Sequence, residues 1–114
     1  MPYVITPEDK LIRRIIRQPD FFKEVDGVLR PSSAAFKLKS GEDGVSVDIQ
    51  ALTTLEKAIP NTVTHTGAIL PAQVPLSLGL PCVHDPVPGN DAHALIKNVT
   101  ASIAKRLAKA AELL

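Results

Sequence analysis

Apolar and polar residues alternate most regularly over residues 45–49 (VSVDI). Val45, Val47 and Ile49 are apolar, and Ser46 and Asp48 lie between them. Because successive side chains of a strand point to opposite faces of a sheet, this pattern predicts a half-buried strand. Other short apolar runs bounded by turn-forming residues predict further strands at 33–38, 66–70, 82–83 and 92–96.

Two turn signals lie in the first half of the chain. Asp26-Gly27 is a dipeptide typical of a two-residue hairpin turn, so residues 21–48 are interpreted as β-structure. The segment 40–44 (SGEDG) is charged and glycine-rich, and it lies between the predicted strands 33–38 and 45–49. We therefore expect these two strands to pair as an antiparallel hairpin.

A helix is predicted over residues 8–17 (EDKLIRRIIR). Thr6 is a suitable N-cap, Pro7 suits the first helical position, and Pro19 ends the segment. The apolar residues at positions 11, 12, 15 and 16 would form one stripe, with the arginines on the opposite side. The run LIRRII also fits a strand, because periodicity alone does not separate the two structures in a short apolar run.

Two short helices are predicted in the middle of the chain. Residues 53–59 begin with a capping box, in which Thr53 is the N-cap and Glu56 follows three residues later. Residues 73–80 predict a helical turn that ends at Gly79, a residue that often terminates helices.

The last helix is predicted over residues 101–114, with Asn98 or Thr100 as its cap. Its apolar stripe, spaced by three and four residues, consists of Ile103, Leu107, Ala110, Ala111 and Leu114. Together the elements predict an α+β protein: a small, mostly antiparallel or mixed sheet of about five strands, two or three helices and a C-terminal amphipathic helix. A chain of 114 residues has room for a single compact domain, 1–114. The strand order does not follow from the pattern.

Composition and charge lower the expectation of nucleic-acid binding. The chain has three Phe, one Tyr and no Trp, whereas proteins that stack single-stranded bases use exposed aromatic rings. The net charge is +1, from 13 basic and 12 acidic residues, so overall charge does not favour a phosphate backbone.

The single cysteine, Cys82, lies in an apolar run and is expected to be an inert thiol. One cysteine forms no internal disulfide and no paired-cysteine metal site. The N-terminal residues lack the pattern of a signal peptide, and no window approaches the roughly 20 apolar residues of a membrane span. We expect a cytoplasmic protein without membrane association.

The densest polar cluster is the segment 84–93 (HDPVPGNDAH), which lies between two apolar runs. Imidazole exchanges protons near neutral pH, and a neighbouring carboxylate orients it, so this segment suits acid–base chemistry or ligand binding. The same residues are also good turn formers, so a purely structural turn is the alternative. The histidine spacing fits no zinc pattern and no phosphate-binding loop is present, so neither a metal nor a cofactor is expected. The candidate catalytic residues are His84, Asp85 and His93, and the candidate ligand-binding residues are Asn90 and Asp91.

Ser32 and Ser33 are further candidates for ligand binding. A serine nucleophile needs a base within hydrogen-bond reach and a third group that orients the base. His84 or His93, with Asp85, would supply both groups. No G-x-S-x-G motif is present, and serines after a proline are common in turns.

Two groups of basic residues are candidates for binding nucleic acid or an acidic partner. They are Arg13, Arg14 and Arg17 in the first predicted helix, and Lys105, Arg106 and Lys109 in the last one. The outer face of an amphipathic helix is commonly charged, so a solvated surface explains the second group equally well.

These observations leave three hypotheses about function. The first is a small non-catalytic interaction or regulatory module that acts with a larger protein partner or as a homo-oligomer, suggested by the small size and the lack of catalytic motifs. The second is a small enzyme or ligand-binding domain that uses the segment 84–93. The third is nucleic-acid binding through the basic residues. No family is identified from the sequence.

Overall fold

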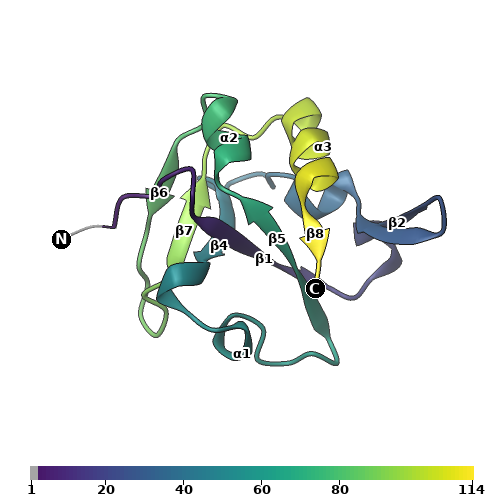
Figure 1. Cartoon of the computed structure of the whole chain (residues 1–114), viewed down its shortest axis with the longest axis horizontal. Helices are drawn as coiled ribbons and strands as arrows, with labels where there is room; N and C mark the ends of the chain where they lie inside the picture. Colours follow the sequence, from purple (N-terminus) through teal and green to yellow (C-terminus); the bar gives the residue numbers. More distant parts are fainter. Residues whose placement is uncertain (1–2) are drawn as a thin grey trace.

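A computed structural model describes residues 3–114 of the chain. This part of the chain forms three α-helices, a six-stranded antiparallel sheet and a separate two-stranded sheet (Figure 1). The large sheet contains β1 (Lys10–Ile16), β4 (Val45–Ile49), β5 (His65–Pro71), β6 (Cys82–His84), β7 (His93–Ile96) and β8 (Glu112–Leu113). The small sheet contains β2 (Phe22–Val25) and β3 (Val28–Pro31). The α-helices are α1 (Leu55–Ala58), α2 (Gln73–Ser77) and α3 (Ala101–Ala110), and the 3-10 helices are η1 (Pro19–Phe21), η2 (Ser33–Phe36) and η3 (Gln50–Leu52).

The predicted α+β class is confirmed, and the sheet is larger than expected. Its strand order is β6-β7-β4-β1-β5-β8, and all five pairings are antiparallel. The predicted strands at 45–49, 66–70, 82–83 and 92–96 all lie within it. The additional members are β1 and the two-residue strand β8.

The helix predicted over residues 8–17 is wrong, because this segment forms the central strand β1. Leu11 and Ile12 point to opposite faces of the sheet, and both are buried. A strand that is buried on both faces is apolar without strict alternation, so its pattern resembles that of a helix. The expected helix start is a turn instead, in which the Asp9 Oδ2 accepts a 2.8 Å hydrogen bond from the Thr6 backbone N–H.

The strand predicted over 33–38 is also wrong, because residues 33–36 form the 3-10 helix η2. The expected hairpin with 45–49 is therefore absent, and β4 pairs with β1 and β7. Phe36 explains the difference, since its fully buried ring anchors η2 in the core beneath α3. The Asp26-Gly27 turn is confirmed: it joins β2 to β3 with φ angles of 53° and 78°, as a two-residue hairpin turn requires.

The three α-helices lie where the sequence predicts helices, with different ends. The N-cap of α1 is Thr54 rather than Thr53, and its Oγ1 accepts a 3.2 Å hydrogen bond from the Lys57 N–H. Thr100 caps α3, as one of the two predicted alternatives. This helix ends at Ala110, before the predicted 114, because the following residues extend to pair with β5.

The hydrophobic core lies on one face of the large sheet, which η2, α2 and α3 cover. Figure 1 shows α2 and α3 above the sheet and α1 below it. Leu107 of α3 and Leu70 of β5 are both fully buried in this core. On the opposite face α1 forms only a small second cluster, in which Ala58 and Ile59 pack on Ile12. We call this second face the open face, because α1 covers only part of it.

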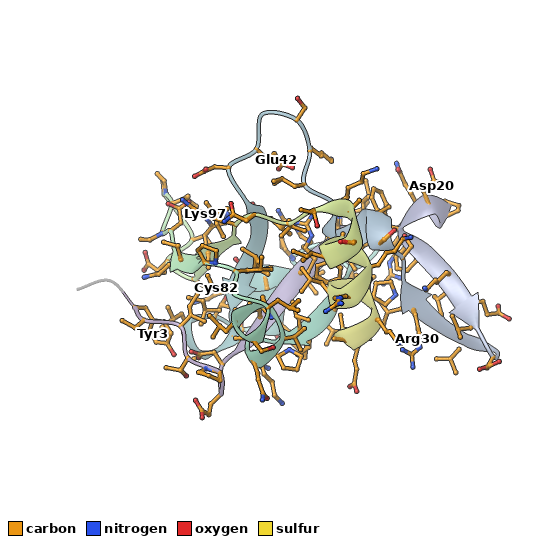
Figure 2. The ribbon with its side chains drawn as sticks, turned by 90° about the horizontal axis from the view of Figure 1, so that it is seen from above. Tyr3, Asp20, Arg30, Glu42, Cys82 and Lys97 are labelled. Carbon is orange, nitrogen blue, oxygen red and sulfur yellow. The ribbon has the colours of Figure 1, made fainter. Side chains whose placement is uncertain are left out.

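Two segments project from the body of the molecule. Figure 2 shows α3 lying across the sheet, while the loop that carries Glu42 and the β2–β3 hairpin that carries Arg30 extend away from it. Among residues 3–114, no helix has both the length and the apolar character that crossing a membrane requires.

Candidate functional site

A cleft of about 950 Å³ lies on the open face of the sheet. Its lining comes from β1, β4 and β7, from η3 and α1 on one side, and from the loop that joins β6 to β7 on the other. In Figure 1 this loop and α1 lie on the same lower side of the sheet. The polar groups in the cleft include Arg14, Ser46, Asp48, Lys57, Asn90 and His93.

Strand pairing places four polar side chains on the open face, of which Asp85 lies outside the lining of the cleft. The register pairs Asp48 of β4 directly with His93 of β7, so their side chains are neighbours on the same face. Ser46 is two residues from Asp48 and shares that face. Beyond β6, the Asp85 N–H donates a 2.8 Å hydrogen bond to the His93 carbonyl oxygen, which continues the ladder and brings Asp85 opposite His93.

His93 is the centre of a hydrogen-bonded chain. Its Nδ1 lies 2.8 Å from the Asp85 carbonyl oxygen and 3.4 Å from the Asp85 Oδ2. A carbonyl oxygen only accepts hydrogen bonds, so Nδ1 carries a proton and, in the neutral ring, Nε2 is the acceptor. The Ser46 Oγ lies 3.2 Å from Nε2 and therefore donates to it. The chain therefore links the Ser46 hydroxyl to the His93 imidazole and the imidazole to Asp85.

Asn90 connects the β6–β7 loop to the sheet. Its Nδ2 donates a 2.8 Å hydrogen bond to the Asp48 Oδ1, and its Oδ1 accepts a 3.1 Å hydrogen bond from the Ala92 N–H. Both ends of this side chain are thus used, so it shapes one wall of the cleft. The exposed Asp91 lies next to it on the same wall.

Three cations line the cleft. One is the half-buried Arg13, and the other two are Arg14 from β1 and Lys57 from α1. Both are exposed, and neither side chain forms a hydrogen bond or an ion pair with any residue in 3–114. Their charged groups are available to a ligand in the cleft.

Arg13, the third cation of the cleft lining, is held by hydrogen bonds to two backbone carbonyl groups. Beyond Ile12, β1 no longer pairs with β4, and the Arg13 guanidinium fills the gap. Its Nη1 donates to the Ser46 carbonyl oxygen and its Nε to the Ala35 carbonyl oxygen, each at 2.8 Å. Burial lowers the pKa of Arg13 from its usual value, although arginine stays charged.

His84 lies outside the cleft, because alternation along β6 turns it to the other face of the sheet. Its Nδ1 accepts a 2.9 Å hydrogen bond from the Tyr3 N–H, and its Nε2 donates to the Asp91 carbonyl oxygen at 2.6 Å. The Tyr3 ring stands edge-on to the imidazole, at 6.1 Å between ring centres. His84 therefore holds the N-terminal segment and the β6–β7 loop together.

The remaining candidates are dispersed. Ser32 donates from its Oγ to the Asp20 carbonyl oxygen at 2.6 Å, and Ser33 begins η2, so neither lies in the cleft. Arg17 donates from its Nε to the Thr62 carbonyl oxygen. The basic residues of α3 are exposed above the core, on the opposite side of the sheet from Arg14. These residues are Lys105, Arg106 and Lys109. The structure does not bring the two basic groups together.

The thiol of Cys82 is half-buried, and burial raises its pKa to about 11. Within residues 3–114 there is no group of three His, Cys, Asp or Glu side chains arranged to hold a metal ion.

Among the residues that line the cleft, the sequence analysis names His93, Asn90, Asp91 and Arg14 as candidates, but it does not name Ser46 and Asp48. Their signal was the polar half of the alternating segment 45–49, which was interpreted only as the solvent face of a strand. Recognising them requires the pairing of β4 with β7, which no local pattern encodes.

Comparisons of the chain with protein-family models, with curated proteins and with solved structures find no match.

Proposed function

We propose that the protein binds a small polar molecule with an anionic group in the cleft on the open face. The observation that carries this proposal is a cleft of about 950 Å³ that contains a hydrogen-bonded serine and histidine and two cations, Arg14 and Lys57, without a side-chain partner among residues 3–114. Ligand sites are typically concave, of about 300–1,000 Å³, with a few oriented polar groups.

The charges in the cleft support a carboxylate or phosphate as the anionic group. Arg14 offers a planar fork that matches two oxygens, and Lys57 offers a flexible point charge. Asp48 and Asp91 bring negative charge to the side near the β6–β7 loop. A ligand with hydroxyl or amino donors at its other end would complement both sides.

The test is a titration of ¹⁵N-labelled protein with inorganic phosphate and with succinate, followed by NMR. Saturable shifts are expected for backbone amides that line the cleft, including those of Ser46 and Asn90. Lys57→Gln should weaken these shifts. Lys105→Gln is the matched control, because it removes the same charge from the exposed face of α3. Shifts that never saturate, or that survive Lys57→Gln and Arg14→Gln unchanged, would exclude the proposed binding mode.

The interaction-module hypothesis stays a prediction, and the β2–β3 hairpin favours it. Val28 and Leu29 are each 56% exposed on this projecting hairpin, and Val25 is 40% exposed. Exposed apolar side chains that cluster mark protein-interaction sites. A pull-down from host lysate with nuclease, using the native chain and Val28→Asp, tests it. A stoichiometric protein partner that Val28→Asp loses would support the hypothesis, and recovery of the same proteins with both chains would count against it.

A further inference from the structure

We propose that Ser46 is an activated nucleophile and that the cleft is a site of acyl transfer from small polar esters. This inference rests on the proposed function, because the ester must occupy the same cleft. The geometry that supports it is a chain of three residues. The Ser46 Oγ lies 3.2 Å from the His93 Nε2. The His93 Nδ1 lies 2.8 Å from the Asp85 carbonyl oxygen and 3.4 Å from the Asp85 Oδ2.

The position of each group fits its role. Ser46 and His93 line the cleft, so an entering carbonyl carbon meets the hydroxyl and its base together. The His93 side chain is only 18% exposed, while the Asp85 side chain is 49% exposed at the rim. Asp85 holds the tautomer in which Nε2 accepts a proton, and its carboxylate stabilises the imidazolium that forms. The serine lies on a strand of the sheet, which is a rigid support for a reacting group.

The proposed reaction has two balanced steps. In the first, the Ser46 Oγ forms a bond to the acyl carbon while its proton moves to the His93 Nε2. The bond from the acyl carbon to the alcohol oxygen then breaks, and the leaving alkoxide takes the proton from His93. In the second, water gives a proton to His93 and attacks the acyl-serine, which releases a carboxylic acid and restores the Ser46 hydroxyl.

The cations in the cleft are suited to the charge that develops. The oxygen of the acyl carbonyl becomes negative in the tetrahedral intermediate, and cationic groups aimed at it lower the barrier. Arg14 and Lys57 are the cleft cations without partners in the described chain. The released carboxylate is itself an anion of the class that the cleft is proposed to bind.

The experiment is covalent labelling of the whole chain with a fluorophosphonate, read by intact mass and by peptide mapping. The serine oxygen displaces fluoride from phosphorus, so one phosphonyl group should be added, at Ser46. Ser46→Ala should abolish labelling, and His93→Gln should slow it by about 100-fold or more, the range for loss of a general base. Ser32→Ala is the matched control and should label like the native chain, because the Ser32 Oγ donates to the Asp20 carbonyl oxygen and Ser32 does not line the cleft.

Hydrolysis of p-nitrophenyl acetate gives a second readout. An initial burst of p-nitrophenol, equal to the protein concentration, would show the acyl-serine directly. The Ser46→Ala variant should lose the burst, and a circular dichroism spectrum like that of the native chain would show that it is folded. The phosphate-dependent NMR shifts of the native chain report binding separately. If the native chain shows those shifts but is neither labelled nor acylated at Ser46, the inference is wrong and the proposed binding function stands. If labelling falls on other serines, or His93→Gln labels at the native rate, the inference is equally wrong.

Discussion

Replacing Arg13 with methionine tests whether this side chain holds β4 and η2 together. The guanidinium donates 2.8 Å hydrogen bonds to two carbonyl oxygens that belong to different elements, Ala35 in η2 and Ser46 in β4. Methionine retains an unbranched stem of similar width but donates nothing, so both carbonyls lose their partner.

The expected loss of unfolding free energy follows from these two hydrogen bonds. A hydrogen bond from a charged donor contributes about 1.5–3 kcal/mol, and the lower end applies here because both bonds are only partly buried. The loss is therefore about 3 kcal/mol, a large part of the roughly 5–15 kcal/mol by which domains are stable. The melting temperature should fall by roughly 12 °C, at about 4 °C per kcal/mol.

The assay is urea and thermal unfolding followed by circular dichroism. Arg14→Met is the matched control, because Arg14 is the next residue of β1, is exposed, and its side chain bonds to no residue in 3–114. Arg14→Met should change the unfolding free energy by no more than about 0.5 kcal/mol. The unfolding midpoint of Arg13→Lys should lie between those of Arg13→Met and Arg14→Met, since one ammonium group does not reach both carbonyl oxygens as the guanidinium does. Equal unfolding midpoints for Arg13→Met and Arg14→Met would refute the bridging role.

Three other predictions concern separate parts of the molecule. Because burial raises the pKa of Cys82 to about 11, its thiol is protonated at neutral pH. Alkylation by iodoacetamide at pH 7.5 should therefore be slow in the folded chain and faster in urea, and fast alkylation of the folded chain would contradict the prediction. His84→Ala removes the acceptor of the Tyr3 N–H, so hydrogen exchange at the Tyr3 amide should become faster, while the unfolding free energy falls by only about 1 kcal/mol. An unchanged exchange rate would show that other contacts hold the N-terminal segment. Gly67→Ala would press a methyl group against the Cδ1 atoms of Ile59 and Leu114 and should lower the unfolding free energy by about 1–3 kcal/mol. Ile59→Val removes the nearer of these atoms and should reduce that loss, whereas strict additivity in the double variant would argue against the contact.

Most of the elements were predictable because their signals are local. The alternation over 45–49, the Asp26-Gly27 turn and the Thr100 cap each act within a few residues, and each appears in the structure. The errors concern segments whose structure depends on distant contacts. Residues 10–16 are a strand because β4 and β5 lie on either side of them, and residues 33–36 are a 3-10 helix because Phe36 is buried under α3.

Among the residues of the cleft, the sequence marked the polar cluster in 84–93 and, as part of a basic group, Arg14. Asn90, Asp91 and His93 lie together in sequence, so composition alone marked them. Ser46 reaches His93 only through the register of β4 with β7, and Lys57 approaches from a helix on the open face. Because the strand order does not follow from the sequence pattern, the proximity of Ser46 and Lys57 to His93 could not be predicted from it.

The strand order also has a consequence for how the chain folds. In the large sheet only β6 and β7 are consecutive strands; β1 pairs with β4 and β5, β4 with β7, and β5 with β8. Most of the sheet therefore forms by closing long loops, which is the slowest kind of step in two-state folding, with expected times of about milliseconds to seconds. The outer edge of β5 is paired by β8, and the Leu114 N–H adds a 2.9 Å hydrogen bond to the Gly67 carbonyl oxygen. During synthesis on the ribosome, this edge stays unpaired until residue 113 has emerged, so the sheet is complete only after β8 has been made.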